Sequence, residues 1–262
     1  MVLNKSKNII INKYTNYNED ERLVKDRAHN IEFLTTMRYI QKYLKPGAKI
    51  LEIGAATGRY SITLAKMGYD VTAVDLTPKH VEIMKQKSKR LKSFQCMVAD
   101  ALDLNMFKDN SFDLVLNFGP MYHLFNLKDK NKAISETLRV AKKNAICMFA
   151  YLSSSSLIPY SVRTNDVLHV VSLMDKTGRA KDIPEEIFAC SYIEDFKKLF
   201  EKTKSRYITN IATDGISPYM REWIEQLSKK DYEAFKNWHF MTCERLDHQG
   251  LSCHLLYICK KK

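Results

Sequence analysis

A glycine-rich turn follows an apolar run that contains a single acid. The stretch Lys49–Ser61 reads KILEIGAATGRYS, with Glu52 inside the apolar run and Gly54 and Gly58 in the turn. Glycines at such a turn allow the backbone to approach a ligand closely, and the amides of a following helix can face that ligand. The sequence therefore predicts a site for a nucleotide-like ligand at this turn.

The glycine spacing excludes two common nucleotide sites. A dinucleotide fingerprint needs G-x-G-x-x-G, whereas residues 54–59 read GAATGR and lack the second glycine. No Gly-Lys-Ser/Thr follows, so the turn is not a P-loop either. The ligand must belong to another class.

Short apolar strands alternate with amphipathic helices around this turn. We expect a helix from Ile31 to Leu44, because its apolar residues recur at helical spacing and Pro46-Gly47 end it. Alternating strand and helix patterns predict an α/β fold, a doubly wound, seven-stranded and mostly parallel sheet. The expected strands cover residues 49–54, 71–76, 94–100, 112–119, 145–152, 207–215 and 252–260.

The chain divides into a leader and one domain. We expect a polar leader at residues 1–30 and a single domain at 31–262. Two insertions, at about 153–190 and 216–248, are expected to form a helical lid over the substrate. Residues from Ser153 to about Ala189 look irregular, and a long loop of this kind is usually functional in a compact domain.

Four motifs resemble, in their order along the chain, those of class I S-adenosylmethionine-dependent methyltransferases. The resemblance covers about residues 31–152. LEIGAATG is similar to their first motif, with Ala56 in place of the usual middle glycine. The whole chain, including GPMYHL and TCER, also resembles a bacterial group of poorly defined substrate. The resemblance implies S-adenosylmethionine (SAM) as cofactor, S-adenosylhomocysteine (SAH) as product and no metal. It implies donor-binding roles for Glu52, Gly54, Ala55, Ala56, Gly58, Asp75, Leu76, Asp100, Ala101 and Asn117, with Asp75 at the ribose and Asp100 and Ala101 at the adenine.

Methyl transfer from a sulfonium requires chiefly that acceptor, methyl and sulfur are aligned in a dry pocket. A general base is needed only when the acceptor arrives protonated. Tyr122 and His123 directly follow the turn after the fourth expected strand, and an imidazole that titrates near neutrality suits proton removal. We therefore name both as candidate catalytic residues, although His123 could instead cap the next helix or face solvent.

Five further residues are candidates for contact with the substrate. Tyr17 lies with Tyr14 and Arg22 in the leader, which the family often folds over the cofactor, and Arg38 is a possible partner for the cofactor carboxylate. On the C-terminal lid we expect polar contacts from His239, Arg245 and His254, although a packed role for His239 is equally open. His239 and Cys243 have a spacing that two zinc ligands could use, but we expect no metal there.

The acceptor is expected to be a small molecule that is methylated on O, N or S. The fourth-strand motif NFGPMY departs from the Asn/Asp-Pro-Pro-aromatic sequence of nucleic-acid aminomethyltransferases. Two alternatives stay open: an RNA methyltransferase, favoured by the net charge of +12 and the Lys260–Lys262 tail, and a non-catalytic cofactor-binding regulator.

The location is expected to be cytoplasmic. No apolar run is long enough for a signal-peptide core or a membrane span, and the six cysteines are dispersed without a CxxC pair. We expect a small-molecule acceptor as the partner, without nucleic acid or membrane, and a monomer or homodimer.

Overall fold

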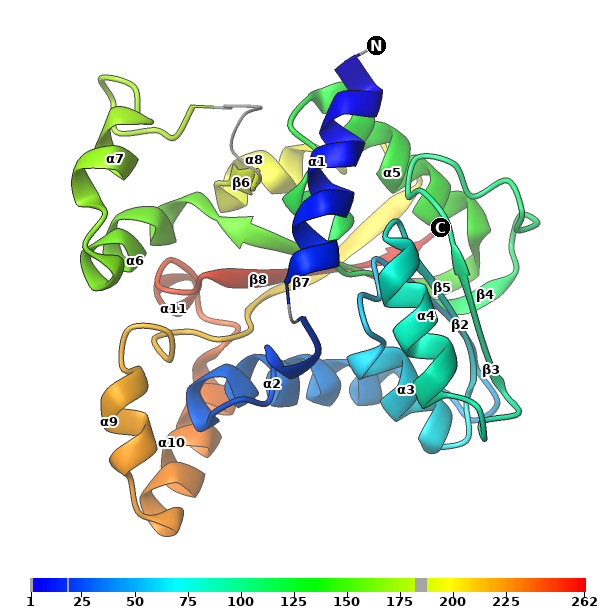
Figure 1. Ribbon diagram of the computed structural model, residues 1–262, viewed down its shortest axis with the longest axis horizontal. Helices are drawn as coiled ribbons and strands as arrows, with labels where there is room; N and C mark the ends of the chain where they lie inside the picture. The colour runs from blue at the N-terminus through cyan, green and yellow to red at the C-terminus, as the bar shows by residue number, and fades with distance from the viewer. Residues whose placement is uncertain (1, 18, 182–187) are drawn as a thin grey trace.

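A twisted, mostly parallel sheet runs through the middle of the protein (Figure 1). The structure is a computed structural model, and it describes residues 2–17, 19–181 and 188–262. The main strand order is β3-β2-β1-β4-β5-β8-β7, and β6 pairs with β5. The strands are β1 (Lys49–Ile53), β2 (Asp70–Asp75), β3 (Phe94–Val98), β4 (Phe112–Asn117), β5 (Ala141–Ser153), β6 (Cys190–Ser191), β7 (Ser205–Ala212) and β8 (His254–Lys261).

The strand directions confirm the predicted α/β class. The pairs among β1, β2, β3, β4 and β5 are parallel, whereas β8 runs antiparallel to both β5 and β7. The order reverses beside β1, so the carboxyl ends of β1 and β4 border a crevice where ligands bind in open α/β sheets. The predicted count of seven strands is wrong by one: β6 has two residues and is too short to leave a sequence pattern.

Helices cover both faces of the sheet, because its central strands are apolar on both sides. One core cluster joins the sheet to α2, α3 and α4, and the other joins it to α5 and α8 (Figure 1). These helices are α2 (Arg27–Tyr43), α3 (Arg59–Lys66), α4 (Pro78–Lys87), α5 (Leu127–Val140) and α8 (Ile193–Lys198). The predicted first helix therefore exists, but it begins four residues earlier than Ile31, where Asp26 caps it by accepting a hydrogen bond from the His29 amide at 2.8 Å.

The leader and the first insertion are more helical than the sequence suggested, whereas helices were already expected in the second insertion. The leader contains α1 (Val2–Asn16) and the short 3-10 turn η1 (Glu19–Glu21). The segment expected to be irregular after β5 contains α6 (Leu157–Thr164) and α7 (Val167–Ser172), and the second insertion contains α9 (Arg221–Gln226), α10 (Lys229–Thr242) and α11 (Leu246–Gln249). The division into leader, single domain and substrate lid stays a prediction.

In the described part of the chain, no helix combines the length and the apolar character that crossing a membrane requires.

Candidate active site

A cavity of about 320 Å³ lies at the carboxyl ends of the central parallel strands. Its wall combines the leader, the turns after β1 to β4, and the first residue of β8. Most of the predicted site residues line it: Glu52, Gly54, Ala55, Ala56, Asp75, Leu76, Asp100, Ala101, Tyr122, His123 and His254. Residues that follow β1, β2, β3 and β4 therefore lie together around this cavity.

The two glycines of the first turn serve different purposes. Gly54 has a φ of +78°, and a Cβ at this position would lie 2.5 Å from the Phe118 carbonyl oxygen and 2.6 Å from Pro120 Cδ. Only glycine allows the turns after β1 and β4 to approach so closely. Gly58, at φ +84°, is the N-cap of α3, and its Cβ would lie 2.9 Å from Ile62 Cδ1. Gly58 is therefore needed for the start of α3, and it is not one of the described cavity-lining residues.

Ala56 occupies a backbone conformation that favours glycine. Its φ is +47°, in the left-handed region, and its amide donates to Asp75 Oδ2 at 2.7 Å. The turn therefore keeps its shape without the family's middle glycine, but at a cost in conformational energy.

Replacing Ala56 with glycine is expected to raise the free energy of unfolding by about 0.5–1 kcal/mol, because glycine adopts this φ without strain. The matched control is Ala55→Gly, since Ala55 has no positive φ. That variant should lose stability in the same urea titration. Equal destabilisation of both variants would contradict the strain at Ala56.

Asp75 ends β2 and holds the turn together. Its Oδ1 accepts from the Thr77 amide at 2.8 Å and lies 3.1 Å from His80 Nδ1, while Oδ2 accepts from Ala56. A carboxylate has about four acceptor positions, so one stays available on a cavity-lining residue. The arrangement leaves room for one ligand hydroxyl at Asp75.

Glu52 is the buried acid of the first turn. Its side chain is 1% exposed, and within the described residues its Oε2 has no hydrogen-bond partner. Burial raises the pKa of Glu52 to about 8, with a smaller lowering from Ser61 and a further rise from Asp75. An uncompensated buried carboxyl group that lines the cavity is well suited to a ligand that carries positive charge.

At the third strand end, Asp100 and Ala101 line the opposite wall. Asp100 Oδ1 accepts from the Leu102 amide at 2.9 Å, and its other oxygen forms an ion pair with Lys7 of α1. This ion pair ties the leader to the predicted adenine end of the cavity.

Asn117 is not where the resemblance implies. It is fully buried, its Nδ2 donates to Thr137 Oγ1 of α5 at 3.0 Å, and it is not among the described residues that line the cavity. Successive residues of a strand point to opposite faces, and it is the next residue, Phe118, that reaches the cavity. We therefore correct the expected role of Asn117. Its side chain connects β4 to α5 instead of contacting the donor.

Two aromatic residues and an imidazole stand beside the fourth-strand turn, η2 (Pro120–Tyr122). His123 Nε2 lies 3.1 Å from the Tyr14 hydroxyl of α1, and its ring lies 5.5 Å from that of Phe188. Tyr122 is held by its carbonyl oxygen, which accepts from the Ala189 amide at 2.6 Å. Burial raises the pKa of both Tyr14 and Tyr122 well above the ordinary value, so both phenols stay protonated.

Four predicted substrate residues lie elsewhere. Tyr17 is 47% exposed with its ring edge toward Tyr14, and Arg38 is exposed and lies over the Phe240 ring. Arg245 is exposed and pairs with Asp247, while His239 is buried beside Gly215. None of the four lines the cavity in the described part of the chain. Several leader residues do line the cavity, and one of them is Tyr14, about one helical turn before Tyr17.

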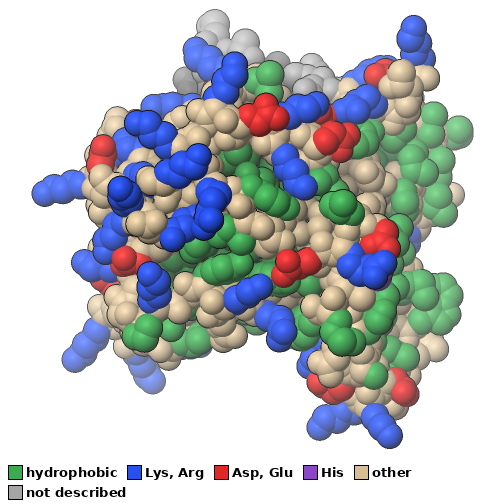
Figure 2. Space-filling model, turned by 180° about the vertical axis from the view of Figure 1, so that it is seen from behind, with side chains coloured by type: hydrophobic (Ala, Val, Ile, Leu, Met, Phe, Trp, Pro, Cys, Tyr) green, Lys and Arg blue, Asp and Glu red, His purple; other side chains and the backbone are tan. Residues whose placement is uncertain are grey.

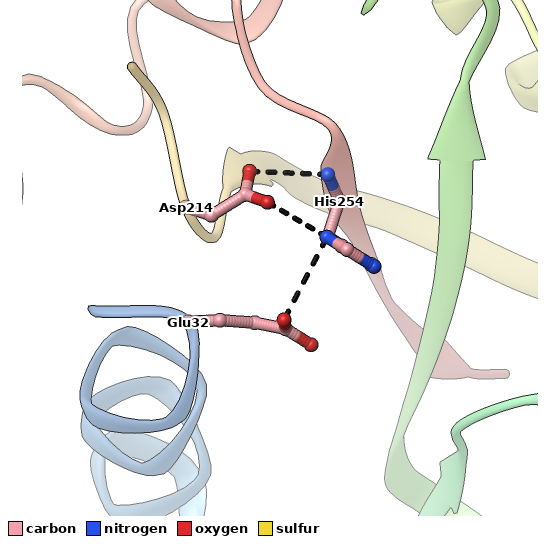
Figure 3. A group of neighbouring side chains, drawn as sticks. All are labelled: Glu32, Asp214 and His254. Carbon is pink, nitrogen blue, oxygen red and sulfur yellow. Dashed lines mark hydrogen bonds and ion pairs between the residues drawn. The ribbon is translucent and has the colours of Figure 1, made fainter. Parts of the chain in front are cut away.

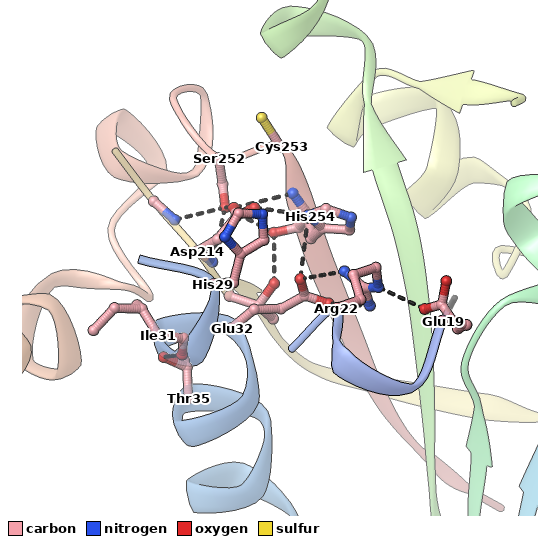
Figure 4. A network of polar contacts seen from close by, with 12 residues as sticks. Glu19, Arg22, His29, Ile31, Glu32, Thr35, Asp214, Ser252, Cys253 and His254 are labelled. Carbon is pink, nitrogen blue, oxygen red and sulfur yellow. Dashed lines mark hydrogen bonds and ion pairs between the residues drawn. The ribbon is translucent and has the colours of Figure 1, made fainter. Parts of the chain in front are cut away.

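A largely buried charged cluster borders the cavity (Figures 3 and 4). It joins Arg22 of the leader, Glu32 of α2, Asp214 after β7 and His254 of β8. Sequence reasoning placed Arg22 and His254 near the site but missed both acids. Glu32 had left a signal, because a charged residue stands next to Ile31 on the buried stripe of α2.

Comparison with known proteins agrees with this geometry. Residues 51–149 match the methyltransferase domain family. A demethylmenaquinone methyltransferase from Renibacterium salmoninarum is 34% identical over 116 residues, 44% of this chain and 46% of that protein. The chain spans about half the length of the curated relatives it matches.

Two solved structures share the fold. A SAM-dependent methyltransferase from Methanosarcina mazei is 17% identical with a TM-score of 0.57, covering 85% of this chain and 96% of that one. Phosphoethanolamine N-methyltransferase 1 from Haemonchus contortus, in complex with phosphoethanolamine and SAH, is 14% identical with a TM-score of 0.62, covering 98% and 48%. At such identities the likeness establishes the fold alone.

Proposed function

We propose that this chain, a methyltransferase domain in the class I methyltransferase fold, transfers the methyl group of SAM to an O, N or S atom of a small-molecule acceptor. The observation that carries this proposal is the convergence of Glu52, Gly54, Asp75 and Asp100 in one cavity. The named acceptors of the relatives, a demethylmenaquinone and phosphoethanolamine, are both small molecules and support this choice.

The residues present fit the donor. SAM, when bound, supplies an electrophilic methyl group on a positively charged sulfonium. Glu52 offers positive charge a buried oxygen that no described residue hydrogen-bonds, and Asp75 offers a further acceptor position for a ribose hydroxyl. Gly54 keeps the cavity wall free of a side chain, and Asp100 and Ala101 would hold the adenine.

The acceptor side lies between η2, the leader and the start of β8. We propose that Tyr122 and His123 are the candidate catalytic residues that meet the acceptor there. His123 could take a proton only if Tyr14 turns away, because the Tyr14 hydroxyl now lies 3.1 Å from His123 Nε2. In their present positions both side chains line the cavity.

We expect His123→Ala and Tyr14→Phe to lower kcat/KM by similar factors, about tenfold, because each removes the same hydrogen bond. The SAM affinity of His123→Ala, measured by calorimetry, should stay within about twofold of the wild type. Unchanged turnover would exclude His123 from the reacting site. A loss confined to His123→Ala, together with a changed pH profile, would instead make His123 the base.

The test of the function is a screen that measures SAH released from SAM with a panel of phenols, naphthols, primary amines, carboxylic acids and thiols. At least one class should be methylated. SAM binding without turnover on any acceptor would favour a non-catalytic regulator. Figure 2 shows Lys and Arg side chains spread over one face with hydrophobic and some acidic side chains among them, so salt-dependent RNA binding is a separate arm of the screen.

We further propose a cytoplasmic location and a monomer or homodimer. None of the six cysteines, all of which lie among the described residues, forms a disulfide, which suits a reducing compartment.

A further inference from the structure

Asp214 forms two hydrogen bonds with His254. Its Oδ2 lies 2.7 Å from the imidazole Nδ1, and its Oδ1 accepts from the His254 amide at 3.1 Å. Ser252 Oγ donates to the same Oδ1 at 2.5 Å, and Asp214 is only 3% exposed. The ring therefore has one orientation, which is set by a carboxylate that is itself fixed.

A second carboxylate stands on the other side of Nδ1 (Figure 3). Glu32 Oε2 lies 3.6 Å from His254 Nδ1. Arg22 holds Glu32 in place through Nη1 and Nη2, at 2.8 and 3.0 Å, and its Nε donates to Glu19 at 2.6 Å (Figure 4). The imidazole is thus fixed between two acids from different elements, and one of them is anchored by a guanidinium.

This arrangement determines which ring nitrogen of His254 carries the proton. Nδ1 donates to Asp214 Oδ2 and carries a proton, so Nε2 of the neutral ring has a lone pair. In the described part of the chain no group is bonded to Nε2, and the side chain, 23% exposed, lines the cavity. Figure 3 shows this nitrogen pointing away from both carboxylates. His123 differs, because its Nε2 already meets the Tyr14 hydroxyl.

We propose that His254 is the general base of the reaction and that the acceptor is a small molecule with a hydroxyl group. This inference rests on the proposed function. His254 Nε2 takes the hydroxyl proton, and the oxygen lone pair forms a bond to the methyl carbon. The carbon–sulfur bond breaks, its electron pair stays on sulfur, and a methyl ether and SAH result. Asp214 and Glu32 are positioning residues that stabilise the imidazolium.

The same three residues could also hold a cation, since their ligand atoms all lie within 4.8 Å of one another. The partners present favour the imidazole. Both oxygens of Glu32 are taken by Arg22, and the Nδ1 that would face the metal is hydrogen-bonded to Asp214. A cation at this point would have to displace a guanidinium and a ring proton together.

The charged neighbours set the direction of the pH dependence. Burial lowers the pKa of His254, but Glu32 and Asp214 outweigh it and raise the pKa above the ordinary value, with a small lowering by Arg22. Tyr122 also faces this ring, and the centres of the two rings lie 6.2 Å apart. A base must be neutral to act, so turnover should fall as the pH drops through a value above about 6.5.

The experiment compares the pH profile of kcat in the full chain and in four variants, one of them His123→Ala, with SAM and the fastest phenol or naphthol of the panel. His254→Ala should lower kcat about 100- to 1,000-fold and remove the acidic limb, with SAM affinity unchanged. Asp214→Asn should move the limb to lower pH. His29→Ala is the matched control, since His29 also pairs with an aspartate, Asp26, at 2.7 Å but does not line the cavity; it should keep the wild-type profile.

Circular dichroism and SAM calorimetry show whether each variant is folded and competent. The inference is overturned if His254→Ala keeps the acidic limb, if that limb is lost in His123→Ala instead, or if only acceptors without a hydroxyl are methylated. Activity abolished by a chelator and restored by a divalent cation would assign the cluster to a metal. Absence of methylation of every acceptor would instead overturn the proposed function itself.

Discussion

Gly54→Ala is expected to weaken SAM binding at least about 100-fold while the fold survives. The new Cβ would lie 2.5 Å from the Phe118 carbonyl oxygen and 2.6 Å from Pro120 Cδ, neither of which is the end of a flexible side chain. The turns after β1 and β4 must then separate, and both line the cavity. A displacement of this kind at a preformed site is enough to disrupt several polar contacts to the donor together.

Gly68→Ala separates backbone strain from this clash. Gly68 has a φ of +93°, but nothing lies within 4 Å of its Cβ position, and it follows α3 outside the cavity wall. This control should lose about 1 kcal/mol of unfolding free energy and bind SAM normally. Circular dichroism shows whether both variants are folded, and calorimetry then measures the SAM affinity of each. Wild-type affinity in Gly54→Ala would show that the turn tolerates a side chain.

The donor side of the site was largely predictable from sequence. The turn at Gly54 and the acids Asp75 and Asp100 each follow an apolar strand, and parallel strands bring their carboxyl ends to one edge. Local pattern and topology therefore agree. The sequence pattern could not predict the hydrogen bonds that Asp75 accepts from the Ala56 and Thr77 amides, because the geometry of the turns brings these groups together.

The acceptor side was predictable only in part, because it depends on contacts between distant segments. Asp214 and His254 are 40 positions apart, and Arg22 and Glu32 meet them only through the packing of the leader and α2. Tyr17 was predicted instead of Tyr14 because the sequence showed the leader only as a polar segment, whereas residues 2–16 form α1, which presents Tyr14 to the cavity.

Glu52 makes the stability of the donor-free protein depend on pH. Burial raises its pKa to about 8, above the ordinary value of 4.5, so the folded state binds a proton that the unfolded chain releases. The contribution of Glu52 to the free energy of unfolding is therefore fully present below about pH 4.5, and it is lost as the pH rises through about 8. A displacement of this size is equivalent to about 5 kcal/mol.

Glu52→Gln should remove this dependence, because an amide has the shape of the protonated acid and cannot ionise. The variant should gain stability relative to the wild type as the pH rises from 5 to 8 in urea titrations. Glu82→Gln, at an exposed position of α4, is the control and should leave the slope unchanged.

The same substitution should weaken SAM binding about 10- to 100-fold, since a charge-assisted hydrogen bond contributes about 1.5–3 kcal/mol. A positively charged donor favours the ionised form of Glu52, so binding near pH 7 should release up to about one proton. Calorimetry in phosphate and Tris, which differ in ionisation enthalpy, measures this release. Glu52→Gln should release none, and an unchanged proton count would place the charge partner of SAM on another residue.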